Sequence, residues 1–377
     1  MSRNRLVHFG VLAGLFLAGF AVCPALSARG EDVTVSAAAK RVAVLVFSGV
    51  ELLDFAGPAE IFAGARDDEQ NPLFEVYTVG IAKKPIKSMR FLTLTPQFDA
   101  TDAGNPDILV LPGGNVEAVM NNAALLQWIE QQREAGCLLF SVCNGASVLA
   151  KLGYLDGLEV ATHHDNIALL ELLAPAAKCR RDCKFVDNGK VVTAAGISSG
   201  IDAALYVVSR ISGPEVAKRV ATYIEYDHYT GLGEQIASQP VKDEHGVIRQ
   251  AGRVHESEPW GVVRLINILR DQGQEAAVKA YPGLLEATNG TDKDMLQSAG
   301  ISMSATWLLR HGRDRQIAMA LLHFNVAANP DSPLAHTDLG KALLDDGMTE
   351  EARKCFARAL ELDPQSKRAK ELLAKCQ

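Results

Sequence analysis

The chain has 377 residues, which exceeds the usual size of one domain and predicts two. Apolar residues make up 48 % of it and charged residues 22 %, a composition that excludes a disordered or fibrous protein. The formal net charge is −7 and the pI about 5.8. This acidic balance argues against the basic face of a nucleic-acid-binding protein, so we expect no nucleic-acid partner.

The first 28 residues have the layout of a secretory signal peptide. Arg3 and Arg5 form a short positive region, an apolar stretch covers residues 6–22, and small residues follow up to Ala28. We therefore expect an exported protein, periplasmic or secreted, with residues 29–40 as a linker. An uncleaved membrane anchor is the alternative, because the apolar stretch is only slightly shorter than a membrane span.

The chain contains seven cysteines, too few for a disulfide scaffold of this length. Cys179 and Cys183 lie four apart in a polar segment. In an exported protein they are candidates for a local disulfide, and two exposed thiols are the alternative. No histidine or further cysteine is close by in the sequence, so we expect no metal there, and no cofactor.

From Arg41 onward, short apolar runs alternate with helical patterns. We predict buried strands over residues 42–47, 74–79, 107–111 and 137–142, a helix over 123–134, a hairpin over 185–195, and helices over 199–211 and 214–226. Continuous apolar strands separated by helices predict a parallel sheet with helices on both faces. Ligands of such folds bind beyond the carboxyl ends of the strands.

The sequence after Asp227 changes in character. Residues 228–257 are polar and rich in glycine, which predicts an irregular connector or a flap. The segment 335–366 then carries small residues at helix contacts, a turn at Gly347 and a helix end at Pro364. It resembles a tetratricopeptide repeat, and two looser copies are centred on Gly312 and Gly273. About three such repeats are needed to bury a shared core.

The segment Phe140-Ser141-Val142-Cys143-Asn144-Gly145-Ala146 follows a predicted strand and opens a helix. A residue at such an elbow stands at the carboxyl edge of the sheet, and small residues keep the turn tight. The helix N-terminus favours the thiolate form of Cys143. A buried, inert cysteine is the alternative, but the position between strand and helix favours a reactive thiol.

Four segments together resemble the ThiJ/PfpI superfamily, which has the class I glutamine amidotransferase-like fold. They are residues 49–62, 111–114, 140–164 and 195–202, and they span about half of the chain. The resemblance implies a flavodoxin-like α/β fold, a parallel sheet sandwiched by helices, here followed by an all-α helical-repeat domain. The motifs are most similar to those of isonitrile hydratases and of domains attached to AraC-type regulators. No helix-turn-helix pattern follows, which argues against a transcription factor.

The resemblance assigns chemistry to two acids and one thiol. Cys143 matches the family nucleophile, and Asp54 matches the acid that hydrogen-bonds its sulfur. Two negative charges side by side would raise both pKa values, so we expect one shared proton, with Asp54 as its donor. Glu60 is a second candidate acid, and a surface helix residue is the alternative reading.

Backbone and histidine groups complete the predicted site. The N–H groups of Gly113 and Gly114, with that of Asn144, are candidates for an oxyanion hole, or else Gly113-Gly114 is a plain turn. His164 matches the family histidine better than His163, and a structural role is the alternative for either. Asn144 stands where the protease-like branch has histidine and the isonitrile-hydrating branch threonine, which leaves the substrate open.

We divide the chain into a signal peptide (1–28), a linker (29–40), a ThiJ/PfpI-like domain (41–230), a connector (231–256) and tetratricopeptide-like repeats (257–377). The leading hypothesis is an exported cysteine-dependent hydrolase or hydro-lyase that acts on a small molecule and is similar to isonitrile hydratases or amidases. A redox or ligand sensor whose repeats recruit a protein partner is the alternative, and a scaffold acting through its repeats alone is a third. The family commonly forms homodimers, which an appended repeat domain would be able to block.

Overall fold

The computed structural model describes residues 39–226, 241–242, 246–251, 261–312 and 314–376. The predicted signal peptide, nearly all of the predicted linker and most of the predicted connector lie outside these residues. Among the helices within them, none is long and apolar enough to cross a membrane.

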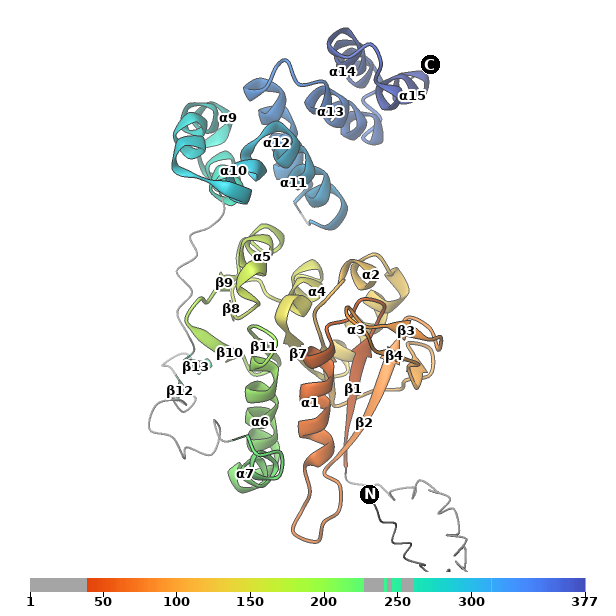
Figure 1. Cartoon of the computed structure of the whole chain (residues 1–377), viewed down its shortest axis with the longest axis vertical. Helices are drawn as coiled ribbons and strands as arrows, with labels where there is room; N and C mark the ends of the chain where they lie inside the picture. Colours follow the sequence, from red (N-terminus) through yellow and green to blue (C-terminus); the bar gives the residue numbers. More distant parts are fainter. Residues whose placement is uncertain (1–38, 227–240, 243–245, 252–260, 313, 377) are drawn as a thin grey trace, which may run out of the picture. The chain divides into compact units, whose positions relative to one another are not determined.

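The α/β domain is built on one large sheet, seen in Figure 1. Its strands are β1 (Lys40–Val46), β2 (Phe74–Gly80), β5 (Phe98–Asp99), β6 (Ile108–Leu111), β7 (Leu138–Val142), β10 (Cys183–Asp187), β11 (Val191–Ala194), β12 (Val241–Lys242) and β13 (Ile248–Ala251). Over the described residues, the order is β12-β13-β10-β11-β7-β6-β1-β2-β5. Five of these strands, β2-β1-β6-β7-β11, run parallel. When these five are numbered by their order along the chain, they stand in the flavodoxin-like order 2-1-3-4-5, which confirms the predicted fold class.

The apolar runs predicted as strands form the middle of this sheet. β1 pairs in parallel with β2 on one side and with β6 on the other. Its residues Val42 to Val46 are each 1 % exposed or less, because helices cover both faces. The antiparallel hairpin of β10 and β11 is also confirmed.

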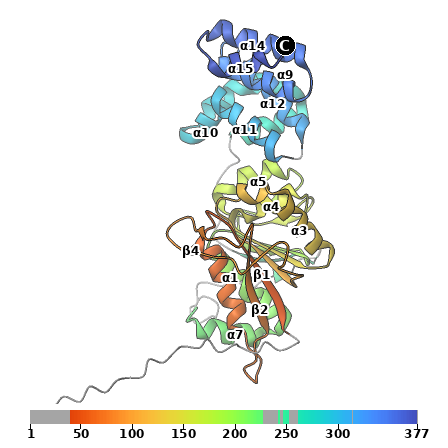
Figure 2. The same cartoon turned by 90° about the vertical axis from the view of Figure 1, so that its right-hand side faces the viewer.

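Helices cover the sheet in two layers (Figure 2). The helices α1 (Leu52–Gly64), α6 (Ser199–Ser212) and α7 (Pro214–Tyr223) pack together on one face, and α3 (Ala123–Glu134) lies on the other. Shorter elements are α2 (Glu117–Met120), α4 (Ala146–Lys151) and α5 (Ile167–Leu173), with the small ladders β3 (Ile86–Lys87) to β4 (Thr93–Leu94) and β8 (Glu159–Val160) to β9 (Lys178–Cys179). The predicted helices over 123–134, 199–211 and 214–226 are therefore confirmed.

The predicted connector is not irregular throughout. Its strand β13 pairs antiparallel with β10, and β12 pairs with β13, so both extend the sheet at one edge. Strand pairing uses backbone groups, and an edge strand does not need the apolar run of a central one. A polar sequence therefore did not reveal these strands.

The C-terminal region is all helical. It contains α9 (Gly261–Ala287), α10 (Gly290–Leu296), α11 (Ser298–His311), α12 (Arg315–Ala328), α13 (Pro333–Asp345), α14 (Thr349–Leu362) and α15 (Lys367–Ala374). Gly273 has a φ of +83° and breaks α9 into two helices, as the repeat pattern predicts. Turns at Gly312 and Gly347 separate the next helix pairs. The helix pairs predicted around Gly312 and Gly347 are confirmed, because α11 packs against α12 and α13 against α14.

The pair Cys179 and Cys183 is not disulfide-bonded within the described residues. Cys183 is buried and Cys179 half-buried, and burial raises the pKa of Cys179 to about 12. The alternative of two exposed thiols is therefore wrong as well, because β9 and β10 tuck both side chains against the domain.

Candidate active site

Cys143 sits on a strained turn between β7 and α4. Its φ is +58°, a left-handed conformation that costs a residue with a side chain on the order of 1–3 kcal/mol. Two hydrogen bonds hold it: the Cys143 N–H donates to the Ala195 carbonyl at 2.9 Å, and Thr162 Oγ1 donates to the Cys143 carbonyl at 2.8 Å. The predicted elbow is confirmed.

Gly145 makes this elbow possible. A Cβ atom at this position would lie 2.0 Å from the carbonyl oxygen of Leu111, at the end of β6. Only glycine allows α4 to begin so close to the neighbouring strand. Gly145 therefore allows the Cys143 thiol to lie close to the loops that follow β6 and β1.

Asp54, on the first turn of α1, meets Cys143 at this edge of the sheet. Its side chain is fully buried, and its Oδ2 accepts a hydrogen bond from the Gly113 N–H at 2.9 Å. Its Oδ1 is buried without a hydrogen bond of normal geometry in the described chain, and the carboxyl interacts with the Cys143 thiol. The loops after β1, β6 and β7 thus bring acid and thiol together as predicted.

Burial dominates the electrostatics of this pair. Desolvation raises the pKa of Asp54 to about 7, and the negative charge of Glu51 adds to this, while the Gly113 N–H and the thiol act in the opposite direction. Burial, and then the charge of Asp54, raise the pKa of Cys143 above its usual value. Burial therefore opposes the thiolate form of Cys143 that the helix N-terminus is expected to favour. Burial and the neighbouring carboxyl thus favour the protonated sulfur, and the carboxyl of Asp54, with a pKa of about 7, is poised to give or take a proton near neutral pH.

Glu51 is a second acid of the site that sequence reasoning missed. Its side chain is only 11 % exposed, its N–H donates to the Gly113 carbonyl at 3.0 Å, and its carboxylate lies 3.9 Å from Nε of Arg90. It stands three residues before Asp54, and this spacing places two side chains on one side of a helix start. That spacing was the available signal.

Two of the three N–H groups predicted to form an oxyanion hole already donate hydrogen bonds to side chains of the protein. The Gly113 N–H is taken by Asp54, and the Gly114 N–H donates to Asn144 Oδ1 at 2.7 Å. Asn144 Nδ2 donates back to the Gly114 carbonyl at 2.9 Å. The fold's own side chains thus reach both glycine N–H groups, and Asn144 ties the elbow to the loop after β6. The Asn144 N–H remains next to the sulfur, where it lowers the pKa of Cys143.

A cavity of about 260 Å³ opens beside the thiol. It is lined by Glu51, Met89, Gly114, Cys143, Asn144, His163, Asp165 and Asn166. Such a volume is at or below the lower end of ligand pockets and suits a small molecule. Polar side chains dominate its lining, and Met89 is its apolar member.

His163 lines this cavity, whereas the favoured candidate His164 does not. The two rings stack with centroids 4.2 Å apart, and His164 is half exposed and pairs with Asp165 at 2.9 Å. Nδ1 of His163 accepts the Asp165 N–H at the start of a short turn, and this bond orients its ring. The three side chains bring candidate metal-ligand atoms within 4.8 Å of one another, although two of them are exposed.

Glu60 does not belong to the site. It lies two turns further along α1 and lines a separate cavity with Val216 and Tyr223 of α7. The helix carries Glu60 away from the sheet edge where Cys143 stands. Glu60 is therefore an acid on the surface of helix α1, which was the alternative to a role in the site.

A buried network of hydrogen bonds holds the backbone of the Cys143 turn in place. Asn166 Nδ2 donates to Thr162 Oγ1 at 3.0 Å and to Ser147 Oγ at 3.2 Å, and Thr162 in turn holds the Cys143 carbonyl. These groups join the turn after β8 to α4. They fix the backbone that carries the thiol and the histidine.

The fold and this site define an α/β domain with a cysteine elbow at the carboxyl edge of its sheet, paired with a buried acid. Residues 40–210 match the DJ-1/PfpI family model, and residues 313–376 match a tetratricopeptide repeat model. The chain is 30 % identical over 192 residues to an isonitrile hydratase of Pseudomonas putida, covering 50 % of this chain and 79 % of the relative. The chain belongs to the DJ-1/PfpI family.

Two further similarities extend the comparison. The protein DJ-1alpha of Drosophila melanogaster is 28 % identical over 190 residues, which cover 48 % of this chain and 82 % of the relative. A crystal structure of a ThiJ/PfpI family protein from Pseudomonas syringae is similar with a TM-score of 0.46 and 23 % identity, covering 55 % of this chain and 84 % of that chain.

Proposed function

We propose that the α/β domain is a cysteine-dependent enzyme that adds water to a small electrophile, with Cys143 as nucleophile and Asp54 as proton donor. An isonitrile is the substrate class we favour, and a small amide is the next. The observation that carries the proposal is a buried carboxyl, with a pKa of about 7, next to a thiol on the floor of a small cavity. The 30 % identity to an isonitrile hydratase supports the choice of substrate class.

The raised pKa values suit an uncharged substrate. A thiol whose pKa is raised reacts only when its proton has somewhere to go, and Asp54 offers that place. The sulfur forms a bond to the terminal carbon of the isonitrile, Asp54 gives its proton to that carbon, and the thiol proton replaces it on Asp54. The product of this step is a thioimidate on Cys143.

Water completes the reaction in the same cavity. It adds to the thioimidate carbon, a proton moves to the substrate nitrogen, and the carbon–sulfur bond breaks to return the thiol. The substrate leaves as an N-substituted formamide, so the sum is the isonitrile plus one water. His163, which lines the cavity, is the candidate base for the attacking water.

Turnover of isonitriles by the purified full chain tests this proposal. Wild-type and Cys143→Ala proteins are incubated with an alkyl isonitrile, a small amide and a 2-oxoaldehyde, and product is measured by chromatography. Formamide production that is lost in Cys143→Ala supports the proposal. No turnover of any substrate by the wild type would overturn it.

A ligand or redox sensor is the second candidate. The observation in its favour is that Cys143 lines a small cavity together with polar side chains, where a ligand is able to contact the sulfur. In that case mild peroxide converts the Cys143 sulfur to an oxidised acid, and a ligand of the cavity protects it. Oxidation at Cys143 without turnover of any substrate above would identify this function.

We also propose that the protein is exported. The layout of residues 1–28 supports this, with a positive start, an apolar stretch and small residues before Ala28. Expression in a bacterial host, followed by cell fractionation and N-terminal sequencing, tests it. A full-length N-terminus retained in the cytoplasmic fraction would contradict export.

A further inference from the structure

The reaction proposed above leaves the carboxylate of Glu51 without a role. Glu51 is buried, with only 9 % of the residue exposed, and its side chain lines the same cavity of about 260 Å³ as the thiol of Cys143. A charged group is costly to bury unless it is paired or accepts hydrogen bonds. A buried carboxylate that the protein itself satisfies poorly, on the wall of a cavity, is therefore a candidate contact for a ligand.

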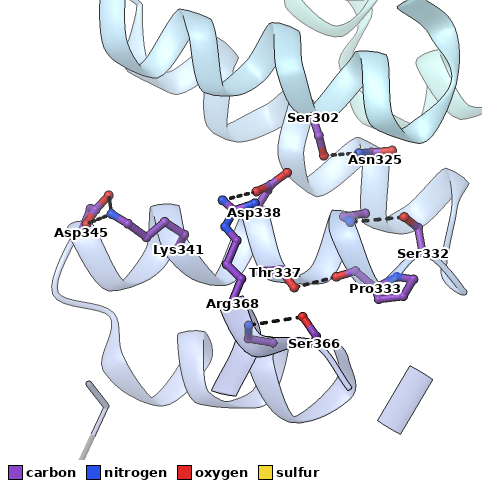
Figure 3. A network of polar contacts seen from close by, with 12 residues as sticks. Ser302, Asn325, Ser332, Pro333, Thr337, Asp338, Lys341, Asp345, Ser366 and Arg368 are labelled. Carbon is purple, nitrogen blue, oxygen red and sulfur yellow. Dashed lines mark hydrogen bonds and ion pairs between the residues drawn. The ribbon is translucent and has the colours of Figure 1, made fainter. Parts of the chain in front are cut away.

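The other buried acids of the described residues each have a close partner. They are Asp54, Asp187, Asp202 and Asp338. Each accepts a hydrogen bond or an ion pair at between 2.6 and 3.1 Å. Figure 3 shows one of these contacts, the ion pair that joins Asp338 of α13 to Arg368 of α15 at 2.6 Å. Such distances are those of normal hydrogen bonds, so the protein itself holds each of these four carboxyls.

The carboxylate of Glu51 has no contact of this kind. Within the described part of the chain, Arg90 is the one cationic side chain within 4.0 Å of it, and its Nε lies 3.9 Å away. This distance is too long for a hydrogen bond, and 67 % of the Arg90 side chain is exposed. An exposed partner at this distance compensates a buried charge only weakly. The carboxylate thus has unused capacity to accept hydrogen bonds on the side of the cavity.

The cavity around Glu51 has a negative lining. Asp165 contributes a second carboxylate, although 77 % of its side chain is exposed, and the lining contains no lysine or arginine. Nδ1 of His163 accepts an N–H, so this ring is neutral in the structure. The charge of Glu51 also reaches the reacting groups, since it raises the pKa of both Asp54 and Cys143. A site with this field favours a cation beside the thiol and disfavours an anion.

We propose that Glu51 binds the cationic end of the substrate, so that the site selects small electrophiles that carry an ammonium group. This selection rests on the function proposed above for the reaction at Cys143, and it defines the substrate class more closely. Among isonitriles it favours an aminoalkyl isonitrile. The reactive carbon lies at the Cys143 sulfur, the alkyl chain lies beside Met89, and the ammonium donates to Glu51 the hydrogen bonds that the protein does not supply.

The thiol of Cys143 reports this charge whether or not the protein hydrates an isonitrile. Methanethiosulfonates that carry a 2-aminoethyl, 2-hydroxyethyl or 2-sulfonatoethyl group form a disulfide with its sulfur, methanesulfinate leaves, and the thiol proton passes to solvent. Mass spectrometry of the Cys143 peptide from the full chain gives each rate, which is divided by the rate of the same reagent with free cysteine. We expect the cationic reagent to react fastest and the anionic reagent slowest.

Glu51→Gln should lower the ratio of the cationic to the anionic rate roughly tenfold. The substitution also removes a charge that raises the pKa of Cys143, but this speeds all reagents alike and cancels in the ratio. Arg90→Ala should raise the ratio, because it removes the cation nearest to Glu51. Glu60→Gln is the matched control, since it makes the same change on α1 outside the lining, and it should leave the ratio within twofold of the wild type.

A faster anionic than cationic reagent, or an equal effect of Glu51→Gln and Glu60→Gln, would overturn the proposal. Turnover is measured on two isonitriles of the same shape, the cationic 3-(dimethylamino)propyl and the uncharged 4-methylpentyl compound. We expect kcat/KM to favour the first, and Glu51→Gln to reduce this preference at least fivefold. If neither compound is turned over but the ratio behaves as expected, the isonitrile reaction fails and the charge selection stands. Equal turnover of both compounds, with a ratio that Glu51→Gln does not change, would overturn the selection alone.

Discussion

Replacing Asp54 by asparagine tests the electrostatics of the site most directly. Asparagine has the shape of a protonated aspartate, and its oxygen is able to keep the hydrogen bond from the Gly113 N–H. The substitution therefore removes the titration of Asp54 and little of the packing. Its effect on stability should depend on pH in a way that a change of packing would not.

The sign and size follow from the two pKa values. The pKa of Asp54 is about 7 in the folded protein, against an ordinary value of 3.8. Between these two values the folded state keeps a proton that the unfolded chain has lost, so stability falls as the pH rises and then levels off above about 7. At about 1.36 kcal/mol per pKa unit, the loss approaches about 4 kcal/mol at pH 8 and is roughly 1.5 kcal/mol at pH 5.

Asp54→Asn should escape this loss. We expect its stability relative to the wild type to grow by about 3 kcal/mol between pH 5 and pH 8. For a domain of this size that is a change of roughly 8 °C in the difference between the two melting temperatures. Differential scanning calorimetry of both proteins at the two pH values measures it.

A matched control is Asp68→Asn, whose side chain is 89 % exposed in the same domain. It should change the melting temperature little, and by the same amount at both pH values. If the advantage of Asp54→Asn were equal at pH 5 and pH 8, the pKa of Asp54 would not be raised, and its role as a proton donor near neutral pH would fail.

Three further outcomes are expected. Alkylation of Cys143 by iodoacetamide should be slow at pH 8 and faster in Asp54→Asn, because the neighbouring negative charge that raises the pKa of the thiol is gone; mass spectrometry of the modified peptide measures the rate. His163→Ala should lower turnover at least tenfold while His164→Ala changes it less than threefold, because only the first side chain lines the cavity; steady-state kinetics of both variants decide this. Gly145→Ala should destabilise the α/β domain by about 2–4 kcal/mol, because its Cβ would lie 2.0 Å from a carbonyl oxygen of β6. Urea unfolding measures this, and a variant as stable as the wild type would show that the turn at Cys143 does not require glycine at this position.

The elements that the sequence predicts correctly are those written in local patterns. The apolar run of β1 predicts a central strand, because a strand that is buried on both faces admits few residue types. The glycine at position 145 predicts a tight turn, because only glycine fits where two backbone segments approach closely. Cys143 could be placed at the edge of the sheet for the same reason. Asp54 followed from the family resemblance, and the structure brings it to the thiol.

The details that the sequence did not reveal depend on the direction of side chains and on burial in three dimensions. Whether His163 or His164 faces the cavity is decided by a turn of three residues, which no periodicity describes. The pKa of Cys143 depends on how completely the two acids and the surrounding loops exclude water. Glu51 was within reach, since it stands three residues before Asp54, but only its burial beside Gly113 shows that it belongs to the site.

A last prediction concerns the packing of α13 against α14 in the helical region. Gly340 lies on α13 where α14 crosses it, and a Cβ there would lie 2.7 Å from the ring of Phe356, which is fully buried. Crowding of this kind costs about 1–3 kcal/mol, and the better helix propensity of alanine returns at most about 1 kcal/mol. Gly340→Ala should therefore lower the stability of the helical region by about 1–2 kcal/mol.

Gly283→Ala is the control for Gly340→Ala, because no atom lies within 4 Å of a Cβ built at this helical glycine of α9. It should raise stability by up to about 1 kcal/mol, since it gains helix propensity without crowding. Urea unfolding followed by circular dichroism at the helix wavelength compares the two. If both substitutions stabilised the protein equally, the close contact of α13 with α14 would not be rigid.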